Sequence, residues 1–185
     1  MSTAAPRRSP DQRREQVLRA AEEILVERGL RATTMSAVAE RAGVAKGTTY
    51  LYFASKDDLL AAVRSRYLDR FIAAMATDVD APAGERLEAV VGGLFEVAAA
   101  HQALHHVLFH EAGFSEADAF TPVRTLLDDI LTTGAATGRL AVDDTAVASS
   151  FLLHGIHGAL VDGLHADRPP AGDAVARLVR RAVGC

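Results

Sequence analysis

Residues 34–60 read TMSAVAERAGVAKGTTYLYFASKDDLL, and this stretch decides the fold. Its spacing predicts a helix, a turn at Gly43, a short helix over residues 46–52 and then a serine-capped third helix. The only two lysines of the chain, Lys46 and Lys56, both lie here. A short helix that opens with Lys-Gly-Thr-Thr and ends in two tyrosines suits a DNA groove, so we expect a DNA-binding regulator.

The charge of the chain is unevenly distributed. Although the formal net charge is −4, residues 1–66 hold 12 Lys and Arg against 8 Asp and Glu, whereas residues 67–185 hold 8 against 16. A basic N-terminal third on an acidic body indicates that one end of the molecule faces phosphate.

Composition narrows the class of protein further. Hydrophobic residues make up 49% of the 185, enough for a core. The sole cysteine, Cys185, excludes an intramolecular disulfide and a thiolate cluster. The first ten residues lack the apolar run of a secretory signal. The uncharged window between Asp144 and Asp162 is short for a membrane span and suits a helix buried between protein surfaces. We therefore expect a soluble, cytoplasmic protein.

Helix signals recur along the chain, and strand alternation does not, so we expect an all-α fold. Ser9, followed by Pro10 and Gln12, predicts a capped first helix that ends at Gly29. A hinge is expected over residues 78–84. The remaining helices are expected from Ser55 to the hinge and near residues 85–100, 101–112, 121–138, 143–166 and 172–184. The domains are then a flexible arm over residues 1–8, a head over 9–56 and a body over 57–185.

The short helix and its neighbours supply the candidate DNA contacts. Gly47 removes a side chain where backbone has to approach DNA closely, and Lys46 can reach a phosphate or a guanine edge. The two threonines can bond a phosphate or a base edge, and the two tyrosines can reach the backbone. Thr34 and Ser36 open the preceding helix, and Lys56 lies in the first turn of the next. The candidates are Thr34, Ser36, Lys46, Gly47, Thr48, Thr49, Tyr50, Tyr52 and Lys56.

Three apolar residues of the same stretch are assigned to packing instead: Val44, Leu51 and Phe53. Local packing or plain solvation is the alternative for each polar residue taken singly, so the interpretation depends on the combination.

The segment GVAKGTTYLYFASKDDLL resembles the helix-turn-helix signature of the tetracycline-repressor (TetR) family, and the similarity covers about residues 12–62. The resemblance implies an all-helical protein, usually of nine helices, that dimerises through its last two helices. It also implies a repressor that leaves an inverted-repeat DNA operator when a small-molecule effector binds the body. Base contacts then belong to the short helix, and phosphate contacts to its tyrosine and the following lysine. By resemblance, these roles pass to Lys46, Gly47, Thr48, Thr49, Tyr50, Tyr52 and Lys56.

Three residues depart from the family pattern. Ala45 stands where a serine or threonine cap is common, Thr49 replaces a common leucine, and Tyr52 stands where histidine is frequent. The operator sequence is therefore not predicted.

All seven histidines lie in the body. Pairs such as His101 and His105 share a helix face, which leaves a metal-responsive regulator and, more remotely, a histidine-based enzyme as alternatives. The chain shows no HExxH motif and no paired catalytic carboxylates, so neither a metal, a cofactor nor an enzymatic activity is expected. A protein-binding bundle is disfavoured by the basic head. Candidate walls of an effector pocket are Phe95, Leu104, His105, Phe109, Phe114, Phe151 and His154.

Overall fold

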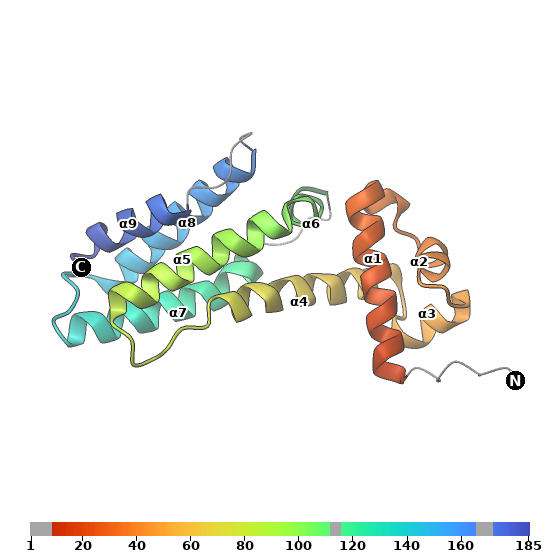
Figure 1. Cartoon of the computed structure of the whole chain (residues 1–185), viewed down its shortest axis with the longest axis horizontal. Helices are drawn as coiled ribbons and strands as arrows, with labels where there is room; N and C mark the ends of the chain where they lie inside the picture. The colour runs from red at the N-terminus through yellow and green to blue at the C-terminus, as the bar shows by residue number, and fades with distance from the viewer. Residues whose placement is uncertain (1–8, 112–115, 166–171) are drawn as a thin grey trace, which may run out of the picture. The chain divides into compact units, whose positions relative to one another are not determined.

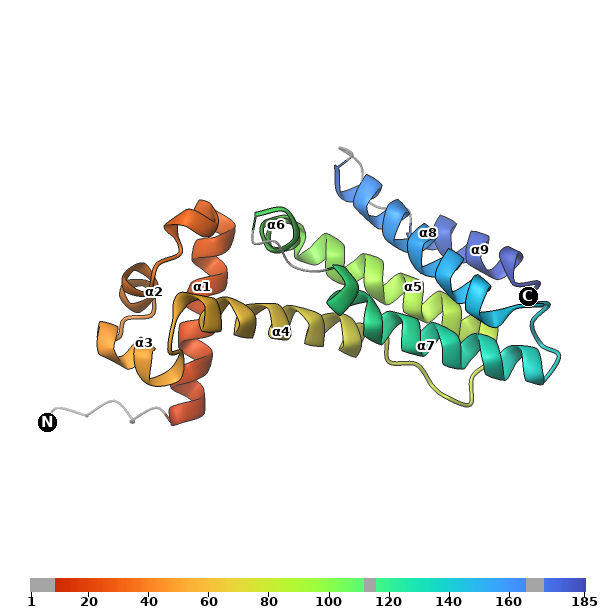
Figure 2. The ribbon, with the colours of Figure 1, turned by 180° about the vertical axis from the view of Figure 1, so that it is seen from behind.

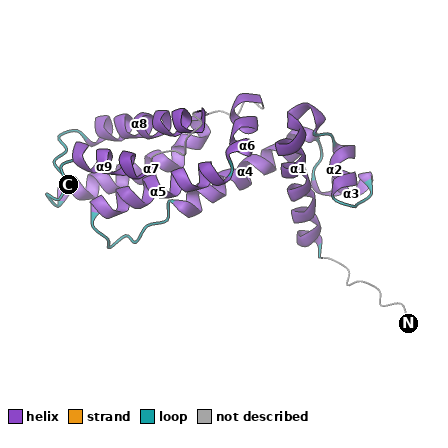
Figure 3. Cartoon of the chain, turned by 45° about the horizontal axis from the view of Figure 1, so that its top comes forward, coloured by secondary structure: helices purple, strands orange, loops and turns teal. Residues whose placement is uncertain are grey.

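The computed structural model describes residues 9–111, 116–165 and 172–185. Within these ranges the chain forms nine α-helices, one π-helical turn and no strand (Figure 3), which confirms the all-α prediction. The elements are α1 (Pro10–Ala32), α2 (Met35–Arg41), α3 (Lys46–Tyr52), α4 (Lys56–Ala74), α5 (Ala83–Ala100), α6 (Gln102–His106), η1 (Val107–Glu111), α7 (Glu116–Ala136), α8 (Thr145–His165) and α9 (Gly172–Ala182).

The helices divide into two compact units. The first unit contains the described residues up to Tyr67 together with 106–111, and the second contains 68–105 and the described residues from Glu116 onward. The expected head over residues 9–56 is therefore shorter than the first unit, because the α4 side chains Leu59, Val63 and Tyr67 are also fully buried there.

In the first unit, α2 and α3 lie along one side of α1 (Figure 1, Figure 2). The Ser9 hydroxyl and the Gln12 side chain form the predicted capping box. Gly29 has a φ of 75°, which interrupts the helix near its expected end, and a short turn continues to Ala32. The Arg66 guanidinium of α4 contacts Glu15 of α1, with 2.6 Å between nitrogen and oxygen. Capping and ion pairing thus stabilise α1, which α2 and α3 contact, and join α4 to it.

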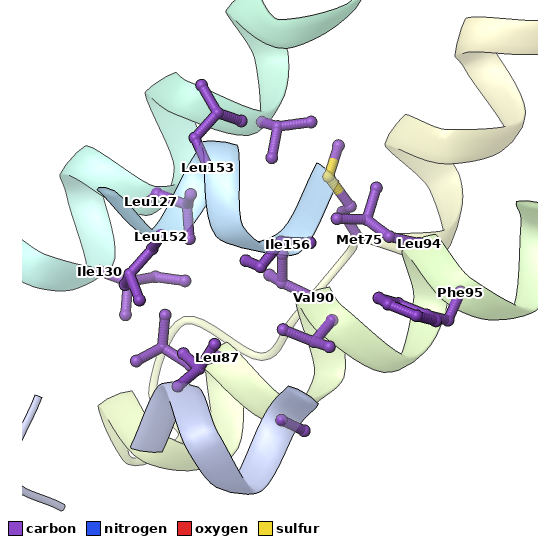
Figure 4. Close-up of a cluster of buried hydrophobic side chains, with 14 of the residues drawn as sticks. Met75, Leu87, Val90, Leu94, Phe95, Leu127, Ile130, Leu152, Leu153 and Ile156 are labelled. Atoms are coloured by element: carbon purple, nitrogen blue, oxygen red, sulfur yellow. The ribbon is translucent and has the colours of Figure 1, made fainter. Parts of the chain in front are cut away.

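The second unit is a helical bundle around one apolar core (Figure 4), to which α5, α7, α8 and α9 contribute. Leu87, Val90, Leu127, Ile130 and Leu153 are among its most buried members. The close approach of α5 to the end of α4 requires a glycine at position 93, because a Cβ there would meet the Ala74 carbonyl oxygen.

Several expected boundaries differ from those observed. Helix α7 begins at Glu116 rather than near Thr121, so Pro122 lies inside it; a proline removes one helical hydrogen bond, and the helix continues past it. Helix α8 begins at Thr145 rather than near residue 143, and the Asp144 carboxylate accepts the Ala146 N–H at its start. Residues 101–112 do not form one α-helix, because α6 passes into the π turn η1. The predicted arm over residues 1–8 lies outside the described residues.

Candidate nucleic-acid interface

The short helix α3 has the predicted bounds, Lys46–Tyr52. As Ala45 predicts, no side chain caps its first turn. The Thr49 hydroxyl donates to the Lys46 carbonyl at 2.7 Å, and the Phe53 N–H closes the helix on the Thr49 carbonyl at 3.0 Å. Thr49 and Phe53 are both fully buried, so this pair defines the packed side of α3.

Two residues of α3 exchange the environments expected for them. Thr49, a candidate DNA contact, is 0% exposed, and its hydroxyl donates a hydrogen bond to a backbone carbonyl of the same helix. Its side chain therefore has no access to DNA. Leu51, assigned to packing, is 81% exposed. Both expectations are wrong because the packed side is set by Phe53, and the residue four before it is Thr49. The four-residue spacing between Thr49 and Phe53 is the sequence signal that places Thr49 on the packed side and leaves Leu51 exposed.

The other candidates on α3 keep access to solvent. Lys46 and Gly47 are exposed, Tyr50 is 46% exposed, and Thr48 and Tyr52 are half-buried. A Cβ placed on Gly47 would meet no atom within 4 Å. The glycine is therefore not required by packing inside this chain, and its lack of a side chain leaves the outer surface of α3 open.

Thr34 and Ser36 are exposed at the start of α2. The Thr34 hydroxyl accepts the Ala37 N–H at 3.2 Å, which makes Thr34 the N-cap of this helix. The Thr34 side chain is thus held by a local hydrogen bond, while the Ser36 side chain is exposed.

Lys56 opens α4 and is half-buried. Its ammonium group donates to the Leu30 carbonyl at 2.7 Å, at the end of α1. The N–H of the same Leu30 donates to the Glu111 carboxylate of η1 at 3.1 Å. Lys56 therefore has a structural partner within the first unit, besides any contact with phosphate.

Not every basic side chain of the first unit is available to DNA. Arg41 of α2 forms ion pairs with Glu23 and Glu27 of α1, and this hydrogen bonding holds the pKa of Glu27 below its usual range. Arg14 lies over the Phe53 ring, 5.0 Å from its centroid. Arg14 nevertheless stays exposed, as does Lys46 of α3, so of these three side chains only Arg41 is held in ion pairs.

The candidate effector-pocket residues are distributed over both units and differ in burial. Phe95, Leu104 and His105 are buried in the second unit, whereas Phe109 belongs to the first unit and packs its ring against Tyr67 at 6.4 Å. Phe114 lies outside the described residues. Phe151 is 70% exposed and so does not line an interior, and His154 is also exposed, with its Nδ1 2.7 Å from the Ser150 carbonyl oxygen.

Helix α8 is long and apolar, but most of it is not buried within this chain. By length and composition, Thr145–Leu164 could cross a membrane, with a mean hydropathy of 1.2, yet only 28% of that window is buried. A helix that packs against another protein surface meets the same criteria. For the part of the chain that the structure describes, no group of three or more His, Cys, Asp or Glu side chains is arranged to hold a metal ion.

The first unit is basic, and a turn at Gly43 joins α2 to the short, exposed helix α3. This arrangement defines a helix-turn-helix DNA-binding protein. Residues 17–63 match the family model described as "Bacterial regulatory proteins, tetR family". The fatty acid metabolism regulator protein of Bacillus subtilis is 32% identical over 134 residues, 68% of this chain and 69% of the relative. The chain therefore belongs to the tetR family and is a DNA-binding transcriptional regulator.

Two further similarities, one in sequence and one in structure, agree with this assignment. The transcriptional repressor KstR2 of Mycobacterium tuberculosis is 37% identical over 93 residues, which span 49% of this chain and 46% of that protein. The crystal structure of FadR from Bacillus subtilis in complex with stearoyl-CoA superposes with a TM-score of 0.74 at 27% identity, covering 89% of this chain and 96% of that one. The predicted family and fold are confirmed.

Proposed function

We propose that this protein is a homodimeric repressor that places two copies of α3 in successive major grooves of an inverted-repeat operator and leaves it when a small molecule binds the second unit. The observation that carries the proposal is the outer surface of α3, where an open glycine lies among exposed basic, hydroxyl and aromatic side chains. The proposed DNA contacts are Thr34, Ser36, Lys46, Gly47, Thr48, Tyr50, Tyr52 and Lys56.

The proposed dimer interface is formed by α8 and α9. Val147 and Phe151 of α8 are 64% and 70% exposed, and Leu178 of α9 is 66% exposed. Gly155 and Gly158 follow at helical spacing on α8, and a Cβ on either would meet no atom within 4 Å. Exposed apolar side chains next to glycines suit the close packing of a second copy of the same surface.

The proposed effector is a long-chain acyl-CoA thioester. The support comes from a Bacillus subtilis relative named for fatty acid metabolism and from a crystal structure of Bacillus subtilis FadR that contains stearoyl-CoA. A hundredfold loss of operator affinity requires only about 2.7 kcal/mol of differential binding between the two states of a regulator. One ligand of this size can supply that difference.

The operator is tested by selecting bound sequences from a random pool of DNA duplexes with the full-length protein. We expect an inverted repeat whose half-sites are about one helical turn apart or somewhat more. A selected motif without two-fold symmetry would contradict the dimeric arrangement, and enrichment of no sequence would contradict operator recognition itself.

The effector is tested by adding stearoyl-CoA to the complex of the protein with the selected operator and following fluorescence anisotropy. We expect release by stearoyl-CoA, with free coenzyme A and stearate as controls that release much less. If all three leave the complex intact, the effector is not a long-chain acyl-CoA.

A further inference from the structure

Leu51 is the most exposed large apolar side chain among the described residues, at 81%. Single exposed leucines are common on protein surfaces and need no explanation by themselves. Leu51, however, lies on α3, whose other exposed side chains are a lysine and a tyrosine. Its exact position around that helix therefore decides what it faces.

That position follows from helix geometry. Successive residues of an α-helix are rotated by about 100°, so Leu51 and Gly47 lie at about 200° and 160° from the buried Thr49. Both project directly away from the side of α3 that packs in the first unit. The flanks of this outer face are occupied by Lys46 and Tyr50 on one side and by Thr48 and Tyr52 on the other.

A helix in the major groove presents its N-terminal end and the centre of its outer face to the base edges, and its flanks to the two sugar–phosphate walls. Helix α3 has only two turns, so Leu51 lies one turn behind Gly47 on the same face. Since Gly47 has no side chain, Leu51 is the side chain that occupies the centre. A leucine has no donor or acceptor for the hydrogen-bonding pattern of a base pair. The apolar feature that the major groove offers is the 5-methyl group of thymine.

We infer that Leu51 is a specificity-determining residue that recognises one thymine in each half-site by packing against its 5-methyl group. The inference rests on the proposed function, in which α3 enters the major groove. Gly47 contributes by leaving room for the helix to approach the bases. The hydroxyl and ammonium groups on the flanks then hold the phosphates on either side.

The test replaces each thymine of the selected half-site, one at a time, by deoxyuridine, which removes only the methyl group. The protein is compared with its Leu51→Ala variant and with Val79→Ala, a control at a valine of similar exposure, 74%, between α4 and α5. For the unchanged protein we expect one position per half-site at which methyl removal weakens binding about threefold to tenfold.

The Leu51→Ala variant should bind the thymine operator about as weakly as the unchanged protein binds the operator that lacks this methyl group. Removing the methyl group at this position should not weaken binding of the variant further, whereas the other thymines should behave as with the unchanged protein. The Val79→Ala protein should behave as the unchanged protein. A repeated selection with Leu51→Ala should lose the thymine preference there and keep the rest of the motif. Because Leu51 is exposed, its truncation removes no core contact.

The inference is overturned if the two proteins lose the same factor at every thymine, or if the half-site has no thymine. Either result leaves operator recognition by α3 intact. By contrast, a protein that selects no sequence at all contradicts the proposed function, so the two failures are distinguishable.

Discussion

Helices α3 and α8 both expose large apolar side chains, yet their surroundings differ. Leu51 of α3 shares the accessible surface of a seven-residue helix with a lysine, two tyrosines and one threonine. Val147 and Phe151 of α8 are followed by glycines on a helix of 21 residues that is apolar over most of its surface. Exposure alone does not tell the two surfaces apart, but the chemistry of the neighbouring residues does.

The difference indicates what each surface fits. An isolated apolar group among hydroxyl and ammonium groups suits a polar partner with one apolar feature, as the major groove is. A largely apolar face with glycines suits a surface of its own kind. Four experiments test this contrast, and they follow in order of the effect expected.

The largest effect is expected for Phe151→Glu on α8. A carboxylate at the centre of an apolar interface has to lose its hydration, so the variant should sediment as a monomer of the 19.6 kDa chain. Operator affinity should fall about a hundredfold or more, because a monomer contacts only one of the two half-sites. The matched control is Val79→Glu, at a similarly exposed residue outside the helices, which should leave the dimer intact. If the Phe151 variant stays dimeric, α8 is not the interface.

The second effect is expected for Gly47→Ala on α3, where stability should rise while operator affinity falls. An alanine in place of this helical glycine should raise the free energy of unfolding by about 0.5–1 kcal/mol, since no atom obstructs the new Cβ. Operator affinity should fall about tenfold, because the methyl group separates backbone from DNA. Urea denaturation and anisotropy measure the two parts. Unchanged affinity with raised stability would show that this face of α3 stays away from DNA.

The third effect separates the two lysines. Lys46→Ala should lower operator affinity and reduce the slope of log affinity against log salt by about one unit, without loss of stability. Lys56→Ala should do the same and also lower the melting temperature, because the Leu30 carbonyl loses its donor. Equal melting temperatures for both variants would contradict a structural role for Lys56, and unchanged salt slopes would remove both lysines from the DNA contacts.

The smallest effect on DNA binding is expected for Thr49→Val, which keeps the shape of a buried residue and removes its hydroxyl. The free energy of unfolding should fall by about 1 kcal/mol, since the hydrogen bond to the Lys46 carbonyl is lost. Operator affinity should stay within about twofold of the unchanged protein. A large loss of affinity at constant stability would mean that the hydroxyl reaches DNA, contrary to its burial.

Local signals in the sequence predicted the first unit well. The Ser9 capping box, the bounds of α3 and the missing cap at Ala45 all depend on residues within one helical turn, so they are visible without tertiary structure. The assignments of Thr49 and Leu51 failed for the opposite reason. In a helix of two turns, polarity favours leucine inside and threonine outside, whereas packing of Phe53 decides the orientation.

The second unit was less predictable. Helix α7 begins at Glu116 and continues past Pro122, whereas a proline is the local signal for a helix start near residue 121. The effector-pocket residues stay a prediction, and their positions show why hydrophobicity was a weak guide. Phe95 belongs to the packed core and Phe151 to an open surface, although both are phenylalanines in apolar helices.

The hydrogen bond from Leu30 to Glu111 has a consequence for dissecting this molecule. The polypeptide leaves the first unit after Tyr67 and re-enters it at residue 106, so the unit is not one continuous length of chain. A fragment truncated at residue 67 would lack the carboxylate that the Leu30 N–H uses, next to the bend at Gly29. Measurements on such an excised fragment would understate how rigidly the intact protein holds the end of α1.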